Sequence, residues 1–151
     1  MKRWTKAKNL GGDGEANIIQ NFGKIFFPIN IENMHWILIV VYTEAREIVC
    51  YDSLNIVPTE ANLRYLKGVE DYLMAEIDAK CLDDSLKDGW VTKVFASTCQ
   101  QENLRDCGVH VCINALLLCA ELDVSVHRKG FMEEGSRRKI GLDILRGSIL
   151  P

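Results

Sequence analysis

The first third of the chain alternates short apolar runs with polar turns, as β-strands do. Apolar residues occupy every second position over 25–31, which predicts a strand, and Pro28 restricts that strand to a sheet edge or a bulge. Residues 36–42 are continuously apolar and rich in β-branched side chains, so we expect a central strand covered on both faces. Residues 43–46 are typical of a turn, and residues 47–51 then form the returning strand of a predicted hairpin.

Further along, the spacing of the apolar positions becomes helical. The segment 58–60 opens a helix, with Thr59 as its predicted N-cap. We expect this helix to pack on the sheet through one stripe, made of Leu63, Leu66, Val69, Leu73 and Ile77. A short strand is predicted over 90–97. Nearly every residue over 108–122 is apolar, as in a helix surrounded by protein, and residues 136–150 predict a last amphipathic helix.

Composition limits the class of protein. With 151 residues and 48% hydrophobic content, the chain fits a single domain over 1–151 with a sizeable core. Its formal net charge of -3 argues against a nucleic-acid binder held by phosphate contacts. No apolar segment is long enough to span a bilayer, so we expect neither a nucleic-acid nor a membrane partner. Residues 8–17, which contain three glycines, are expected to form a mobile surface loop.

The cysteines favour reduced thiols over a disulfide framework. The chain has six of them, Cys50, Cys81, Cys99, Cys107, Cys112 and Cys119. The basic start lacks the apolar region of a secretory signal, and Cys50, Cys112 and Cys119 fall in strand or helix patterns where buried thiols are ordinary. We therefore expect a nuclear or cytoplasmic protein.

A zinc site is disfavoured by spacing. Cys99, Cys107, His110 and Cys112 are close in sequence, but structural zinc prefers two cysteines separated by two to four residues. On one helix, Cys112 would also lie about 140° around the axis from Cys107. The sequence therefore predicts no metal and no cofactor.

The residues just ahead of the apolar helix bring an amide, a carboxylate and a thiol together, as Gln101, Asp106 and Cys107. A cysteine at a helix N-terminus faces unpaired backbone N–H groups and the positive end of the helix dipole, which favour thiolate over thiol. Cys107 is therefore a candidate nucleophile. The alternative is a structural role, because free cysteine is among the most buried residue types.

A thiolate nucleophile needs a base, which is usually histidine, and the chain has three histidines. His127 lies in a polar stretch and is expected to be exposed. His110 follows Cys107 by about one helical turn and could touch the thiol, but its apolar helix favours a core histidine. His35 stands directly before the central strand, at an element end where functional groups are commonly displayed.

The hairpin also offers His35 a carboxylate. If residues 43–46 form the turn, Asp52 lies opposite Ile37, and His35 is two residues away on the same face. Diagonal neighbours of this kind lie about 7 to 8 Å apart, close enough for an imidazole and a carboxylate to meet. The alternative is that Asp52 only begins a turn, as aspartate often does.

Acyl transfer also needs donors for the developing oxyanion. Gln101, six residues before Cys107, can supply a side-chain amide, and the backbone N–H of Cys107 can supply a second donor. Gln100 and Gln101 are equally explained as polar loop residues. Asp106 is an equally good candidate for the N-cap of the helix.

Taken in order, these residues resemble the ubiquitin-like-protein-specific cysteine proteases, the SUMO protease family. The resemblance rests on the strand after His35, the seventeen-residue step from His35 to Asp52 and the six-residue step from Gln101 to Cys107. It covers nearly the whole chain and includes His35-Trp36, Asp52-Ser53, Asp106-Cys107-Gly108, Gly89-Trp90, residues 2–6 and the basic C-terminal helix.

The resemblance implies a papain-like α+β fold with a central helix packed on a mixed, mainly antiparallel sheet. It implies Cys107 as the nucleophile, His35 as the base, Asp52 as its orienting partner and Gln101 in the oxyanion hole. Trp36 would line a narrow channel for a Gly-Gly tail, since glycine lets a backbone pass between close aromatic walls. The implied reaction is cleavage of a precursor tail or an isopeptide bond of SUMO, or less expectedly of NEDD8 or ubiquitin.

Two departures from the family keep alternatives open. The family's catalytic domain begins well before the equivalent of Trp4, so the resemblance implies a domain truncated at its N-terminus, and the loop between Trp4 and His35 is longer than usual. A non-catalytic module that binds a ubiquitin-like protein is therefore a second hypothesis. A same-fold acetyltransferase is a third, although the Gln101 spacing and Trp36 favour a protease.

Overall fold

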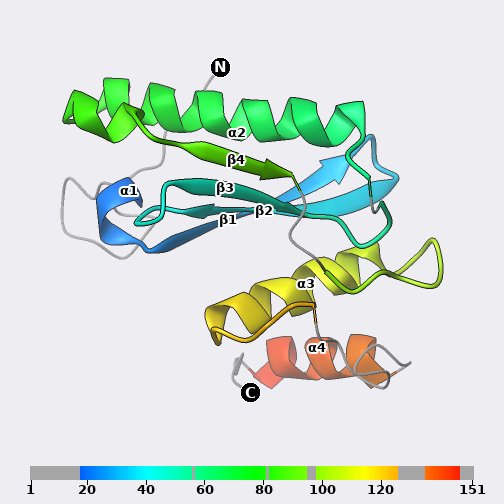
Figure 1. Ribbon diagram of the computed structural model, residues 1–151. Helices are drawn as coiled ribbons and strands as arrows, with labels where there is room; N and C mark the ends of the chain where they lie inside the picture. Colours follow the sequence, from blue (N-terminus) through cyan, green and yellow to red (C-terminus); the bar gives the residue numbers. More distant parts are fainter. Residues whose placement is uncertain (1–17, 56, 81, 95–97, 126–134, 147–151) are drawn as a thin grey trace. The chain divides into compact units, whose positions relative to one another are not determined.

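The computed structural model describes residues 18–55, 57–80, 82–94, 98–125 and 135–146 (Figure 1). Its elements in chain order are α1 (Ile18–Asn21), β1 (Lys24–Ile31), β2 (His35–Tyr42), β3 (Glu47–Tyr51), α2 (Glu60–Ala79), a 3₁₀ turn (Asp84–Lys87), β4 (Val91–Val94), α3 (Cys107–Cys119) and α4 (Gly135–Arg146). The predicted loop over 8–17, His127 and the predicted ends of the fourth strand and the last helix lie outside the described residues.

The described strands form one sheet in the order β1-β2-β3-β4. Short turns join β1 to β2 and β2 to β3, and such turns connect antiparallel neighbours. β4 instead pairs with β3 in parallel, from Glu47 opposite Val91 to Cys50 opposite Val94. A parallel pair requires a long crossover, which α2 supplies. The predicted mixed, mainly antiparallel sheet is therefore confirmed.

The turn between β1 and β2 determines where β2 begins. Glu32 and Asn33 have φ values of 51° and 59°, and the Met34 N–H donates to the Ile31 carbonyl at 2.9 Å. Two consecutive positive φ values match a type I′ turn, whose twist suits a hairpin. The turn places His35 as the first residue of β2.

The described residues divide into two compact units. The first is drawn from the described residues 18–27, 39–50, 58–80 and 82–94. Its core contains buried residues of β2 and β3 and the buried side chains of α2. Ile39, Val40 and Val41 are completely buried, as a strand covered on both faces requires.

α2 begins as predicted, but the first residue of its buried face is Asn62 and not Leu63. Thr59 is the N-cap, and the Asn62 side chain completes a capping box with it. Leu63 is 49% exposed, so its predicted place in the apolar stripe is wrong. Asn62 takes the inward position, where its amide meets the Cys50 sulfur at 3.7 Å. The stripe continues at the predicted positions Leu66, Val69, Leu73 and Ile77.

The second unit is drawn from the described residues 28–38, 51–55, 57, 98–125 and 135–146, and it contains α3 and α4. α3 begins at Cys107, one residue earlier than the sequence pattern predicted, and ends at Cys119 rather than Leu122. Cys112 and Cys119 are exposed free thiols, so their predicted burial is wrong. One side of α3 is thus accessible even though its sequence is apolar all round. Among the described helices, none has the length and apolar character that a membrane span needs.

Candidate active site

Cys107 is the first residue of α3 and one of its buried residues. Burial raises the pKa of the Cys107 thiol, but hydrogen bonds from the Trp36 backbone, the His35 ring and the Gly108 backbone, together with the charge of His35, outweigh it. The net result is a pKa below the ordinary value for cysteine, because each of these donors stabilises the thiolate. The helix N-terminus acts in the same direction.

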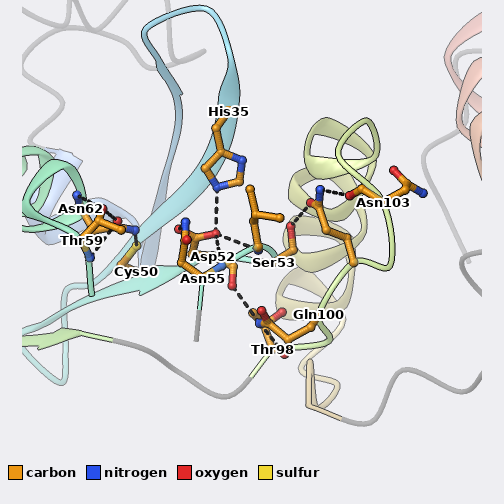
Figure 2. A network of polar contacts seen from close by, with 12 residues as sticks. His35, Cys50, Asp52, Ser53, Asn55, Thr59, Asn62, Thr98, Gln100 and Asn103 are labelled. Carbon is orange, nitrogen blue, oxygen red and sulfur yellow. Dashed lines mark hydrogen bonds and ion pairs between the residues drawn. The ribbon is translucent and has the colours of Figure 1, made fainter. Parts of the chain in front are cut away.

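His35 and Asp52 meet as the hairpin geometry predicts. His35 begins β2, Asp52 follows the last residue of β3, and His35 Nε2 lies 2.8 Å from Asp52 Oδ1 (Figure 2). A carboxylate can only accept, so Nε2 carries a proton and donates it to Asp52. Nδ1 is then the ring nitrogen left to meet the Cys107 thiol, with which His35 also hydrogen-bonds.

The Asp52 carboxylate is completely buried and fixed from several directions. Oδ1 also accepts from the backbone N–H groups of Leu54 at 2.9 Å and Asn55 at 3.1 Å, and Oδ2 accepts from Asn55 Nδ2 at 3.0 Å. The turn that offered an alternative explanation for Asp52 is therefore real, and the same carboxylate serves both the turn and the imidazole.

The pKa of His35 is raised by this arrangement. The hydrogen bond to Asp52 is the largest cause, burial acts against it, and the hydrogen bond to Cys107 adds to it. A raised imidazole pKa beside a lowered thiol pKa favours a thiolate–imidazolium pair, the reactive form of a cysteine nucleophile.

Trp36 makes two contacts with the segment that begins at Cys107. Its backbone hydrogen-bonds Cys107, and its ring lies beside Gly108, where a built Cβ would come 3.7 Å from ring atom Cδ1. Trp36 itself is 38% exposed. An accessible aromatic ring therefore borders the first turn of α3.

Gln101 is held by the turn that carries Asp52. Its backbone N–H donates to the Ser53 carbonyl at 2.7 Å, its Oε1 accepts from Ser53 Oγ at 2.8 Å, and its Nε2 donates to the Asn103 carbonyl. Gln100 Nε2 donates to the Asp52 carbonyl at 3.0 Å (Figure 2). The oxyanion role of Gln101 stays a prediction.

Asp106 is the N-cap residue of α3, as its type suggested, but its side chain makes no capping hydrogen bond, so the expected capping of the helix amides is wrong. The carboxylate instead accepts from Asn103 Nδ2 at 2.6 Å and from Arg137 Nε at 3.0 Å. Arg137 Nη2 donates to the Arg105 carbonyl at 2.6 Å as well. The Asp106 carboxylate therefore binds Asn103 and Arg137 in place of the helix amides, and Arg137 connects α4 to the loop before Cys107.

Sequence reasoning missed Ser53 and Arg137. Ser53 was part of the Asp52-Ser53 pair in the family resemblance, which was the only signal for it. Arg137 is thirty-one residues from Asp106, and no spacing rule connects them. His110 is buried in α3, as expected of a core histidine. Within the described ranges, no three His, Cys, Asp or Glu side chains gather as a metal site would require.

The chain is similar to a known protein family and to curated relatives. A model described as the Ulp1 protease family, C-terminal catalytic domain, matches residues 3–140. Ubiquitin-like-specific protease 1 of Saccharomyces cerevisiae is 29% identical over 116 residues, which are 77% of this chain and 17% of that protein. The chain therefore spans a small part of the length of this curated relative.

Solved structures of Ulp1 proteases also resemble this chain. The SUMO protease Ulp1 with its catalytic cysteine oxidised to a sulfonic acid matches with a TM-score of 0.74 and 27% identity, over 87% of this chain and 57% of that one. The C-terminal Ulp1 protease domain in complex with Smt3, the yeast orthologue of SUMO, matches with a TM-score of 0.72 and 27% identity, over 87% and 56%. The papain-like α+β fold expected from the sequence is confirmed.

Proposed function

The chain belongs to the Ulp1 protease family, and on that premise we propose that it is a cysteine protease that cleaves after the C-terminal Gly-Gly of SUMO or a related ubiquitin-like modifier. The observation that carries the proposal is the contact of His35 with Asp52 at 2.8 Å, together with the interaction of His35 with Cys107 that raises the His35 pKa and lowers the Cys107 pKa. The yeast relative in complex with Smt3 supports a ubiquitin-like substrate.

The proposed reaction has two stages. The Cys107 thiolate attacks the carbonyl carbon of the terminal glycine, forming a C–S bond, and the C–N bond then breaks as His35 gives its proton to the departing amine. The acyl group is left as a thioester on Cys107. Water then attacks this thioester while His35 takes its proton, and the free carboxylate and the Cys107 thiol are released.

The negative charge on the carbonyl oxygen needs donors at each stage. We assign them to the backbone N–H of Cys107 and the Gln101 amide. The amide nitrogen carries two protons, and the Asn103 carbonyl accepts one of them, which leaves one for a substrate oxygen. Removing a single donor of this kind typically costs about 10² to 10³ in rate.

The choice of Gly-Gly follows from Trp36. Its accessible ring beside Gly108 would bring an aromatic wall close to any chain that reaches Cys107. A residue with a side chain would collide with such a wall, whereas glycine has none and adopts a wide range of backbone angles. We therefore propose Trp36 as the residue that selects glycine next to the cleaved bond.

The test is turnover of SUMO, NEDD8 and ubiquitin that carry a fluorogenic amide at the C-terminus. We expect cleavage of at least one of them, loss of cleavage in Cys107→Ser, and wild-type cleavage in Cys112→Ser, an exposed thiol on the same helix. A substrate whose last glycine is replaced by alanine should be resistant. Tight binding of a modifier by a folded chain with no cleavage would support the non-catalytic alternative instead.

A further inference from the structure

The segment before the nucleophile is hydrogen-bonded to the turn that carries the imidazole's partner. Gln100 Nε2 donates to the Asp52 carbonyl at 3.0 Å, and the Gln101 N–H donates to the Ser53 carbonyl at 2.7 Å. Consecutive residues of the turn thus face two different groups of the site. The Asp52 side chain meets His35 (Figure 2). The Ser53 side chain meets Gln101.

The Ser53 hydroxyl has a defined role in this contact. Ser53 is only 3% exposed, and its Oγ lies 2.8 Å from Gln101 Oε1. The Asn103 carbonyl on the other side of the amide can only accept, so Nε2 must face Asn103 and Oε1 must face Ser53. The hydroxyl therefore donates, and the amide is held between a donor and an acceptor in one orientation.

We propose that Ser53 is a positioning residue that fixes the Gln101 amide with its N–H₂ group available to the oxyanion. The inference rests on the proposed function, because it needs an acyl-transfer reaction in which Gln101 stabilises charge. One turn then serves both halves of the chemistry, since Asp52 orients the base and Ser53 orients the oxyanion donor.

Loss of the Ser53 hydroxyl should destabilise the transition state and leave substrate binding unchanged. Without the Ser53 hydroxyl, the amide can rotate and its donors point correctly for only part of the time. Loss of a whole donor costs about 10² to 10³, so we expect partial misplacement to lower kcat about tenfold. KM should be little changed, and so should the pH at which Cys107 becomes alkylated, because Ser53 donates to Gln101 and not to His35 or Cys107.

The experiment compares Ser53→Ala, Gln101→Ala and the double variant in the cleavage assay. We expect Ser53→Ala to lower kcat about tenfold in the wild type and to have no further effect when Gln101 is already alanine. Thr98→Val is the matched control, because Thr98 is also buried and its hydroxyl donates to Asn114 instead. It should lose stability in urea without the drop in kcat.

A second pair of variants protects the test against misfolding. Ser53→Thr and Ser53→Val have the same shape, and only threonine carries a hydroxyl, so the ratio of their kcat values reports the hydroxyl alone. Equal kcat values for this pair, or an equal drop in the Gln101→Ala background, would overturn the inference while leaving the protease activity intact. A folded wild-type chain without turnover would overturn the proposed function and this inference together.

Discussion

Replacing Asp52 by asparagine should separate the orientation of His35 from its charge. The carboxylate oxygen Oδ1 accepts from His35 Nε2 at 2.8 Å, and Oδ2 accepts from Asn55 Nδ2 at 3.0 Å. Asparagine keeps the shape of the side chain but removes the charge. It also places an N–H₂ group on one side, where it meets another donor unless Asn55 rotates.

The magnitude follows from the lost charge. A hydrogen bond to a charged group contributes about 1.5 to 3 kcal/mol, so its loss in Asp52→Asn corresponds to about a 10- to 150-fold lower kcat. The hydrogen bond to Asp52 is also the largest cause of the raised His35 pKa. With a lower pKa, His35 is protonated less often and stabilises the Cys107 thiolate less. The pKa of Cys107 should therefore rise towards its ordinary value.

The assay is the second-order rate of Cys107 alkylation by iodoacetamide as a function of pH, measured together with kcat. Asp52→Asn should move the inflection of the alkylation profile to higher pH. Asn55→Ala, which removes only the partner of Oδ2, is the matched control and should change both quantities less. An Asp52→Asn profile that overlays the wild type would refute the proposed coupling of Asp52 to the thiol through His35.

Three further predictions test stability. Asp52 raises the His35 pKa above 6.5. Protonated His35 therefore stabilises the fold fully below pH 6.5, and this stabilisation is lost as the pH rises through the raised pKa. The difference in unfolding free energy between wild type and His35→Gln in urea should therefore shrink with rising pH, and a widening difference would contradict it. Arg137→Ala breaks the exposed ion pair with Asp106 and should lower the free energy of unfolding by less than about 1 kcal/mol. The same substitution should slow the alkylation of Cys107. Arg138→Ala, on the same helix, should change neither quantity. Leu73→Ala, at a fully buried position, should lower the free energy of unfolding in urea by about 2 to 5 kcal/mol, and Leu63→Ala, at a half-exposed position, by much less. Equal losses would refute the placement of Leu63 outside the buried face of α2.

Features set by neighbouring residues could be predicted from the sequence. The β2–β3 hairpin and the Thr59 cap depend on local patterns, and the structure confirms both. The meeting of His35 and Asp52 was also predictable, because a short turn determines which residues of a hairpin face each other.

Features that depend on side-chain hydrogen bonds could not be predicted from the apolar pattern or from residue type alone. Leu63 and Asn62 are adjacent, and a helical pattern favours the apolar residue for the core. Asn62 is buried instead because it completes the cap and meets Cys50, two contacts that hydropathy does not contain. Asp106 was a good N-cap by residue type, but an arginine from α4 takes its carboxylate.

The central claim is that Cys107, and no other thiol of this chain, reacts with the C-terminus of a ubiquitin-like modifier. Its most direct test is peptide mapping by mass spectrometry after incubation with SUMO, NEDD8 or ubiquitin that carries a C-terminal electrophile. We predict one adduct per chain, located on Cys107, formed equally by Cys112→Ser and strongly slowed in His35→Ala. An adduct on the exposed Cys112 or Cys119, or no adduct on a folded chain, would contradict the claim.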